Sequence, residues 1–530
     1  MDQTRSIEAL QLFQRLQKGI SAAISVFLLM SCQHAPTQFT AISPPSLPNF
    51  NQQSYAPKVN LDVKPISLPQ SNKFSANLYW HQWQPDQTRL NSLNRVRVIA
   101  LTPQQAINSP DVLVQAMNEY VQLLAINSQD EQASCLDNLK ISASMHSLSI
   151  ESYCQQTIGQ QLFTINELLQ GDWLTSANAV INIDKLSHSL KLNKHIGAFT
   201  GSEINQVYLG QLLGKTHPYY DNLNNNAVVE KLSPEAIHAL LKRTTNNAFW
   251  HVFTDQQIAK PSSDTQLTTK VNQYITRNLT IANLQQTGTA PTSHAQSHST
   301  KAKDRPLTLH MIDAPGTVQI QVRLGYSLNE QSPSNIDGNS NINSRDQNNT
   351  MNNSLSCKVL AALLGRSFSG RLFYDLREVR GLTYGIYGQC NDAPLAQYLT
   401  FYGSSALQHS GAFIEGILAH MSLIQTQAIS DGELNALKTY LIGQQTLLND
   451  SQNGKENTFL NNQLLNKPIN ANQQFLAQIE KLSAQDITNI ADHVLSANPV
   501  IVIRGDKALI ESDILQKLPN WTLATISAER

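Results

Sequence analysis

Arg377 and Tyr384 are the side chains of this sequence with the clearest potential for chemistry. Both lie in the segment 369–384, which reads SGRLFYDLREVRGLTY. An arginine and a phenol that face one space can bind a peptide carbonyl and stabilise the negative charge that develops on its oxygen. Simpler roles are open for both, because an arginine in the last turn of a helix complements the helix dipole and a strand tyrosine usually packs.

The elements that must position this pair are a helix, a glycine stop and a strand. Gly381 follows the helical pattern, as glycine commonly does at a helix C-terminus, and a strand pattern begins at Leu382. This order places Arg377 in the last helical turn and Tyr384 in the strand, so that both can point toward one cleft. Arg371 and Asp375, four residues apart, are expected to pair locally on the helix.

The segment 369–384 resembles the C-terminal half of the insulinase/pitrilysin metallopeptidase family. The similarity covers residues 306–518, where the family's order of features recurs: Pro315-Gly316, the run 360–365, Glu433-Leu434 and Arg504-Gly505-Asp506. Residues 74–260 resemble the family more faintly, chiefly through the segment 213–219, LGKTHPY.

This resemblance implies a two-domain member similar to the mitochondrial processing peptidase. Such proteins have two related α+β halves, and their halves or subunits close around an unfolded peptide. It also implies that Arg377 and Tyr384 are the substrate-binding pair of the family.

Catalysis in this family uses zinc held by His-x-x-Glu-His, with the glutamate activating the metal-bound water. The motif lies on a helix early in the first domain. The corresponding positions here are Ala116, Glu119 and Tyr120, so that only the glutamate remains. The sequence therefore indicates a degenerate zinc motif.

The absence of the zinc site does not depend on that exact alignment. No histidine lies between His81 and His146, and no glutamate lies between Glu167 and Glu203, where the resemblance places the third ligand. A site of this kind requires neutral imidazole nitrogen atoms. We therefore expect no catalytic residue and no metal in this chain, with zinc present only in a partner subunit.

The two halves of the chain share an order of features that indicates duplication. Residues 231–237, KLSPEAI, parallel residues 481–487, KLSAQDI, and in both the serine is expected to cap the N-terminus of a helix. Each helix leads into a short strand and an aspartate. Strands are expected at 97–101 and 318–324, and helices at 112–124, 355–364 and 430–447. The predicted fold class is α+β, with two homologous domains that are each a mainly antiparallel sheet with helices packed on one face.

The expected domain organisation follows from composition along the chain. It comprises a signal peptide (1–32), a flexible tether (33–73), an N-terminal peptidase-like domain (74–260), an interdomain linker (261–305) and a C-terminal peptidase-like domain (306–530) with a disordered insertion (329–354).

The N-terminus is similar to that of a bacterial lipoprotein. Basic residues precede an apolar run from Ile20 to Met30, and Ser31-Cys32 follows. Cys32 is then the lipidated residue, and Gln33 after it favours the outer membrane. This places the protein in the periplasm, anchored to the membrane by its lipid. A cleaved signal peptide or a short buried helix are the alternatives.

Four further cysteines, Cys135, Cys154, Cys357 and Cys390, can form two disulfides in an oxidising periplasm. The pairs Cys135–Cys154 and Cys357–Cys390 are favoured because each stays within one domain. Free buried thiols remain an alternative.

Charge gives no indication of a nucleic-acid partner, because 38 Lys and Arg face 39 Asp and Glu. The leading hypothesis is a non-catalytic, substrate-binding subunit of a heterodimeric zinc peptidase, whose partners are a zinc-bearing sibling chain and an unfolded peptide. The first alternative is a peptide-binding or structural scaffold with no peptidase role. The second is an independent metallopeptidase with unrecognised ligands.

Overall fold

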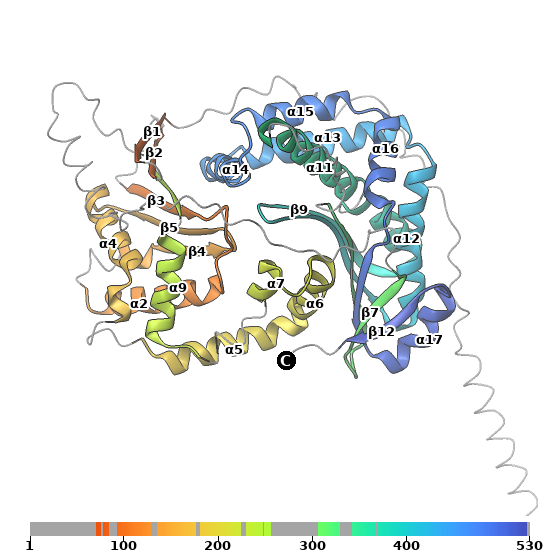
Figure 1. The fold of residues 1–530 in the computed structure, drawn as a ribbon, viewed down its shortest axis with the longest axis horizontal. Helices are drawn as coiled ribbons and strands as arrows, with labels where there is room; N and C mark the ends of the chain where they lie inside the picture. Colours follow the sequence, from red (N-terminus) through yellow and green to blue (C-terminus); the bar gives the residue numbers. More distant parts are fainter. Residues whose placement is uncertain are drawn as a thin grey trace, which may run out of the picture.

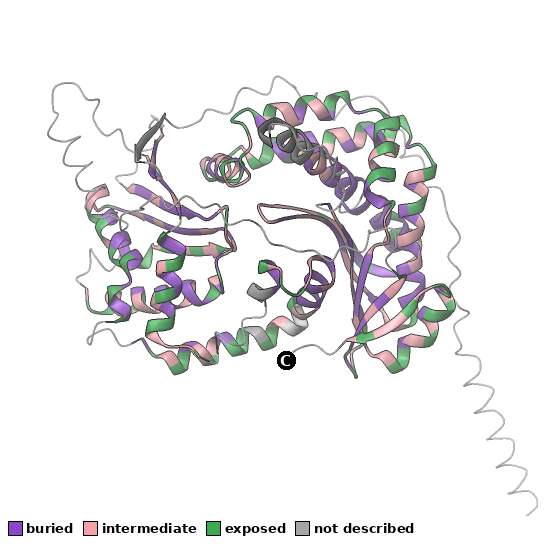
Figure 2. Ribbon diagram, in the orientation of Figure 1, coloured by how far each residue is buried: buried purple, intermediate pink, exposed green. Residues whose placement is uncertain are grey.

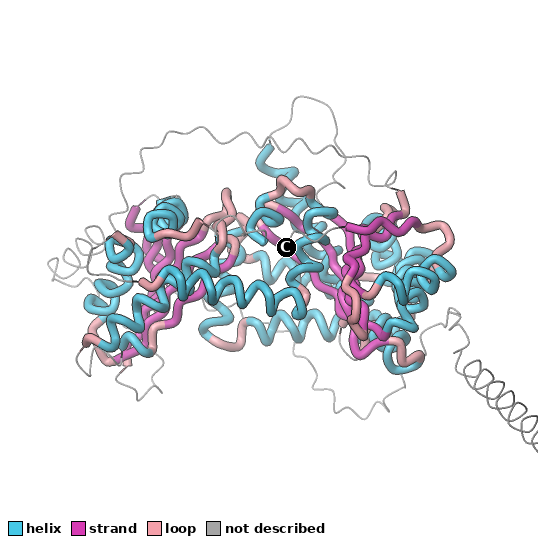
Figure 3. Tube along the Cα trace, turned by 90° about the horizontal axis from the view of Figure 1, so that it is seen from below, coloured by secondary structure: helices cyan, strands magenta, loops and turns pink. Residues whose placement is uncertain are grey.

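Two six-stranded sheets form the framework of the molecule, each covered by helices (Figure 1). The computed structural model describes residues 70–75, 78–83, 93–128, 135–175, 181–223, 229, 231–246, 248–255, 306–328, 342–366 and 369–526. The predicted signal peptide with Cys32 and the predicted linker 261–305 lie outside these residues. Seen from below, the two sheets stand at opposite sides with helices between them (Figure 3).

The first domain has strand order β1-β2-β6-β3-β5-β4, and only β2 and β6 pair in parallel. Its strands are β1 (Gln70–Ser75), β2 (Leu78–Gln82), β3 (Asn94–Leu101), β4 (Lys140–Ser144), β5 (Ser147–Cys154) and β6 (Phe249–Thr254). Its helices are α2 (Pro110–Ile126), α4 (Ile158–Gln170), η1 (Asp172–Leu174), α5 (Ile183–Thr200), α6 (Ser202–Leu213), α7 (Pro218–Leu223) and α9 (Pro234–Asn246).

The second domain has strand order β12-β7-β11-β8-β10-β9, in which β7 pairs in parallel with both β12 and β11. Its strands are β7 (Thr308–Asp313), β8 (Gln319–Ser327), β9 (Thr383–Ala393), β10 (Ala396–Ala406), β11 (Val500–Gly505) and β12 (Thr522–Ile526). Its helices are α11 (Ile342–Gly365), η4 (Phe373–Val379), η5 (Leu407–His409), α12 (Ser410–Thr426), α13 (Asp431–Leu448), α14 (Gln452–Leu464), α15 (Ala471–Lys481), α16 (Ala484–Leu495) and α17 (Lys507–Lys517).

The expected α+β class with two related domains is confirmed. α9, β6 and Asp255 recur as α16, β11 and Asp506, as the repeated sequence pattern predicts. Ser483 caps α16 through a reciprocal pair of hydrogen bonds with Asp486, so its expected N-cap role is confirmed as well.

Each sheet packs the core helices of its own domain on one face, as predicted, and its other face is covered by a helix of the other domain. Helix α14 of the second domain packs on this other face of the first sheet. Helix α6 of the first domain packs on the corresponding face of the second sheet. Along β11, Ile501 and Ile503 face the core of their own domain, whereas Val500 and Val502 contact the cluster around α6. Both faces of the strand are therefore buried, which explains its continuous apolar sequence. Figure 2 shows buried residues, in purple, in the strands of both sheets.

A buried carboxylate fixes α14 on the first sheet. Glu456 is fully buried and accepts hydrogen bonds from Arg95 at 2.7 and 2.9 Å, Arg97 at 3.0 Å and Trp83 at 2.8 Å. Burial alone would raise the pKa of Glu456, but the two arginines outweigh it and lower this pKa. The carboxylate of Glu456, from the second domain, thus holds Arg95 and Arg97 of the first domain in place.

Two histidines complete this interface. His81 Nε2 lies 2.9 Å from His251 Nδ1, and both rings contact Phe459 of α14. Burial lowers the pKa of His81 to about 4 and, together with His81, lowers that of His251 to about 3. Both rings are therefore neutral at ordinary pH.

The reciprocal contact places α6 on the second sheet. Glu203 accepts a hydrogen bond from Arg504 at 2.7 Å, and the hydroxyl of Tyr208 bonds that of Thr400. A Cβ on Gly325 would lie only 2.1 Å from the Tyr208 oxygen, so this strand position requires glycine to admit the tyrosine. The interface therefore depends on a close approach as well as on charge.

Two predicted boundaries need correction. Strand β1 begins at Gln70, so the folded body starts before the predicted end of the tether at residue 73. Helix α11 begins at Ile342, so residues 342–354 belong to a helix and not to a disordered insertion. No helix in the described part of the chain is long and apolar enough to cross a membrane.

Candidate functional site

Arg377 lies near the end of η4, where the helix widens to π-type turns before it stops. Its guanidinium carbon lies 4.6 Å from the centre of the Phe373 ring, and its Nε is 3.5 Å from a carboxylate oxygen of Glu378. The side chain is 37% exposed, which leaves donors open to solvent. Gly381 ends the helix with a φ of 63°, a conformation that suits glycine.

Tyr384 is 78% exposed because the strand is irregular at this point. The pairing of β9 with β10 shifts at Ser404 and Ser405, which oppose Gly385 and Thr383. Such a bulge turns a side chain away from its regular direction. The Thr383 hydroxyl donates to the carbonyl of Ser404 and accepts from the Gly385 amide, so the bulge is held by hydrogen bonds.

A buried carboxylate fixes the segment that joins the two residues. Asp375 accepts a hydrogen bond from Arg380 Nε at 3.0 Å, and its other oxygen lies 2.9 Å from His420 Nε2. Burial alone would raise the pKa of Asp375, but hydrogen bonds from His420 and Arg380 lower it. The prediction that Arg371 pairs with Asp375 is wrong. Arg371 instead binds Glu433 of α13 through two hydrogen bonds.

The structure thus places Arg377 and Tyr384 at the two ends of one braced turn. No hydrogen bond or ring contact joins them among the described residues, and neither lines the cavities described below. Their common role in binding a peptide stays a prediction.

The degenerate zinc positions are used for packing on α2. Ala116 is fully buried in the core of the first domain. Tyr120 stacks on Trp173, with ring centres 4.6 Å apart, and Glu119 lies 3.7 Å from the ammonium of Lys185. The helix therefore presents a methyl group and a stacked phenol where zinc would need imidazoles.

The residues of this helix do not fit zinc. Ala116 has no atom that can bind a metal, and Tyr120 has a phenol, stacked on Trp173, in place of an imidazole nitrogen. Across the described ranges, moreover, no three His, Cys, Asp or Glu side chains lie together as a metal site would need.

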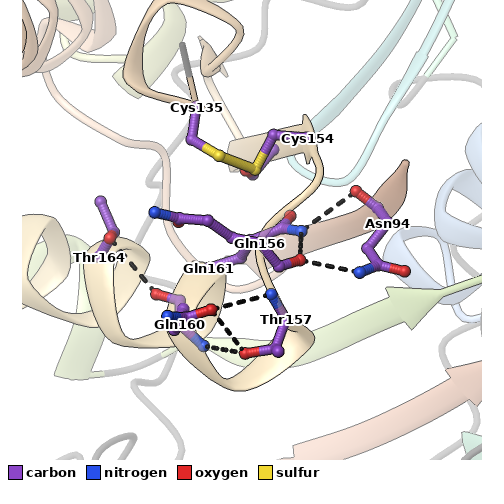
Figure 4. Close-up of a disulfide and its surroundings, with 9 residues drawn as sticks. Asn94, Cys135, Cys154, Gln156, Thr157, Gln160, Gln161 and Thr164 are labelled. Carbon is purple, nitrogen blue, oxygen red and sulfur yellow. Dashed lines mark hydrogen bonds between the residues drawn. A yellow bond between two sulfur atoms is a disulfide. The ribbon is translucent and has the colours of Figure 1, made fainter. Parts of the chain in front are cut away.

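The structure contains two disulfides, Cys135–Cys154 and Cys357–Cys390, which are the favoured pairs. The first joins the turn before β4 to the end of β5, beside the capping box of Thr157 and Gln160 on α4 (Figure 4). The second joins α11 to β9, the strand that carries Tyr384.

Two adjoining cavities lie beside this second disulfide, and the sequence analysis did not find them. Their volumes are about 340 Å³ and about 260 Å³, and Lys358, Gln445, Leu448 and Phe475 line both. Arg366 and Cys390 line the larger one. The sequence feature that could have indicated them is Lys358, a charged residue in the otherwise apolar end of α11, SCKVLAALLG.

Residues 319–441 match the family model described as the Peptidase M16 inactive domain, a segment that contains Arg377 and Tyr384. The non-peptidase homolog YmxG of Helicobacter pylori is 28% identical over 132 residues, which are 25% of this chain and 31% of the relative. The uncharacterized zinc protease YmxG of Bacillus subtilis is 24% identical over 145 residues, which are 27% and 36% of the two chains.

Solved structures share the whole fold. A peptidase M16 inactive domain from Pseudomonas fluorescens has a TM-score of 0.56 at 13% identity, covering 87% of this chain and 100% of that one. A chain of complex III2 from Candida albicans, solved with Inz-5 bound, has a TM-score of 0.57 at 11% identity, covering 86% and 100%. The chain is thus similar to the insulinase/pitrilysin, or M16, family in the sequence of residues 319–441 and in its overall fold. It spans about a third of the length of the curated relatives it matches, and only the inactive-domain model and the Helicobacter relative carry names that support a non-catalytic member.

Proposed function

We propose that this M16 homologue is the non-catalytic, substrate-binding subunit of a heterodimeric zinc peptidase. Arg377 and Tyr384 bind a carbonyl of an unfolded peptide, and the partner chain supplies zinc and cleaves the bond. The main support is the contrast between the degenerate zinc motif on α2 and the turn that carries Arg377 and Tyr384. On α2, the positions that would bind zinc hold the buried Ala116 and the Tyr120–Trp173 stack. Arg377 is partly exposed and Tyr384 is exposed, and hydrogen bonds hold the turn between them in place.

The bracing of this turn favours a binding role over simple packing. A packing tyrosine would be buried, but Tyr384 is turned outward by a bulge, and its neighbours are held by the Thr383 hydroxyl. Preorganised donors bind a carbonyl without an ordering cost at the moment of binding.

We further propose a lipid anchor at Cys32 and a periplasmic location at the outer membrane. Two disulfides support an oxidising compartment, where such bonds persist. Labelling with a radioactive fatty acid, in the wild type and in Cys32→Ser, tests the anchor. Label that remains in the variant would rule it out.

The test of the binding role is reconstitution with a zinc-bearing sibling chain. The mixture should cleave peptides that neither chain cleaves alone, and Arg377→Ala and Tyr384→Phe should each lower cleavage about tenfold, the effect of one lost charge-assisted contact. Arg243→Ala and Tyr374→Phe are matched controls, because Arg243 is exposed on α9 and Tyr374 is partly exposed on η4. Full activity in both site variants would refute the proposal.

A structural scaffold is the second candidate, favoured by the fold shared with a chain of complex III2 from Candida albicans. A scaffold would co-purify in a stable assembly that does not change when Arg377 and Tyr384 are replaced. A substrate-binding subunit would lose peptide binding in the same variants.

A further inference from the structure

The larger cavity of the second domain has the features of a built binding site. Its volume of about 340 Å³ is at the lower end of the range for sites that hold small ligands or single side chains. Aromatic rings line it, with glutamine amides between them: Tyr387, Tyr402, Tyr440, Phe475, Gln389, Gln444 and Gln445. None of the described residues that line either cavity is acidic.

Arg366, directly after the last residue of α11, has the unpaired donors that a ligand could satisfy. It is only 4% exposed, and its Nε and Nη1 atoms have no hydrogen-bond partner within the described part of the chain. Its guanidinium carbon lies 5.5 Å from the centre of the Tyr440 ring, which holds the group at the cavity wall. Burial of unsatisfied charged donors is costly, so an acceptor is missing from this position.

The nearest carboxylate does not fill this need. Glu433 accepts two hydrogen bonds from Arg371, at 2.6 and 2.9 Å, so its charge is already balanced. Arg366 and Arg371 therefore share one carboxylate, which leaves a net positive charge beside the cavity. Burial lowers the pKa of Arg366 by more than the negative charge of Glu433 raises it.

A second uncompensated cation lies two turns earlier on the same helix. The ammonium of Lys358 sits 4.7 Å from the centre of the Phe475 ring, and the carboxylate of Asp392 is taken by Lys467. With a rise of 1.5 Å per residue, Lys358 and Arg366 are separated by roughly 12 Å along α11. The two positive charges on the cavity wall are thus separate, which suits carboxylate groups, with one charge each, better than a phosphate group that carries two.

We propose that this cavity binds a carboxylate group at Arg366, with Lys358 as a second positive charge further along the cavity. The carboxylate comes from an acidic side chain of a bound peptide or from a free small carboxylate. The site itself does not depend on the proposed function, whereas its peptide source rests on it.

The decisive experiment compares ten-residue peptides that carry one Glu, at each position in turn, with the same peptides carrying Gln. Fluorescence anisotropy with the whole chain should show about tenfold tighter binding of at least one Glu peptide, the effect of one charge-assisted hydrogen bond. Arg366→Met should remove this preference and leave Gln-peptide binding unchanged. Arg243→Met, on the exposed face of α9, is the matched control and should keep the preference.

A second arm separates the two sources. Free glutarate should raise the melting temperature of the wild type and not that of Arg366→Met, while glutaramide should raise neither. If glutarate stabilises the chain but no peptide binds, the site exists and takes a free carboxylate. That result contradicts the proposed function but not the site. Equal binding of all Glu and Gln pairs by the wild type, together with no effect of glutarate, would overturn the inference even if Arg366→Met fails to fold.

Discussion

Glu456→Gln is the substitution that tests the exchange of helices between the domains most sharply. The amide keeps the shape of the carboxylate but removes the charge that faces Arg95 and Arg97. Loss of one partner from a buried ion pair costs about 3–5 kcal/mol. Because Arg95 keeps Glu151 at 2.6 Å, we expect the lower end, about 3 kcal/mol.

Amide hydrogen exchange measures this cost locally, at the helix and the strand that the ion pair joins. The amides of α14 and β3 should exchange on the order of a hundredfold faster in the variant. Glu203→Gln is the control in the reciprocal helix α6, where one carboxylate meets the single arginine Arg504. Its effect should be clearly smaller. An increase below about fivefold for Glu456→Gln, or equal effects of both variants, would refute this account.

Three further predictions concern stability and metal binding. His81 and His251 stay neutral in the fold while unfolded histidines protonate near pH 6.5, so stability should fall as pH drops from about 6.5 to about 4, by about 3 kcal/mol for His81 alone. Urea titrations across this range should show the loss, and a flat profile would contradict it. Replacement of Cys357 and Cys390 by serine should cost about 3–4 kcal/mol, because their disulfide closes a loop of 33 residues; thermal melts should show the change, and an unaltered melt would argue against it. Ala116→His should destabilise the chain by about 2 kcal/mol or more and bind no zinc, since the position is fully buried; stoichiometric zinc in that variant would show that the site can be rebuilt.

Local sequence patterns predicted the fold well where one residue type dictates backbone geometry. Gly381 ends η4, Ser483 caps α16, and the repeated run into a strand and aspartate identifies two related domains. The exchange of α6 and α14 could not be foreseen, because Glu203 and Glu456 meet their arginines more than 300 residues away in sequence. The true partner of Arg371, Glu433, is hidden in the same way, whereas the four-residue spacing to Asp375 suggested a false one.

The candidate site shows the same division. The spacing of Arg377 and Tyr384 and the loss of histidine from α2 can be read directly from the residues. The outward turn of Tyr384 depends on the register of β9 with β10, and the isolation of Arg366 depends on which residues surround it in space. Neither property has a local sequence signal.

The central claim is that this chain binds peptides through Arg377 and Tyr384 and does not cleave them. Its most direct test incubates the pure chain with a labelled unfolded peptide and follows binding by anisotropy and cleavage by mass spectrometry, with and without a chelator. We predict binding without cleavage, weakened about tenfold in Arg377→Ala and in Tyr384→Phe. Cleavage that a chelator abolishes, or binding that neither substitution changes, would contradict the claim.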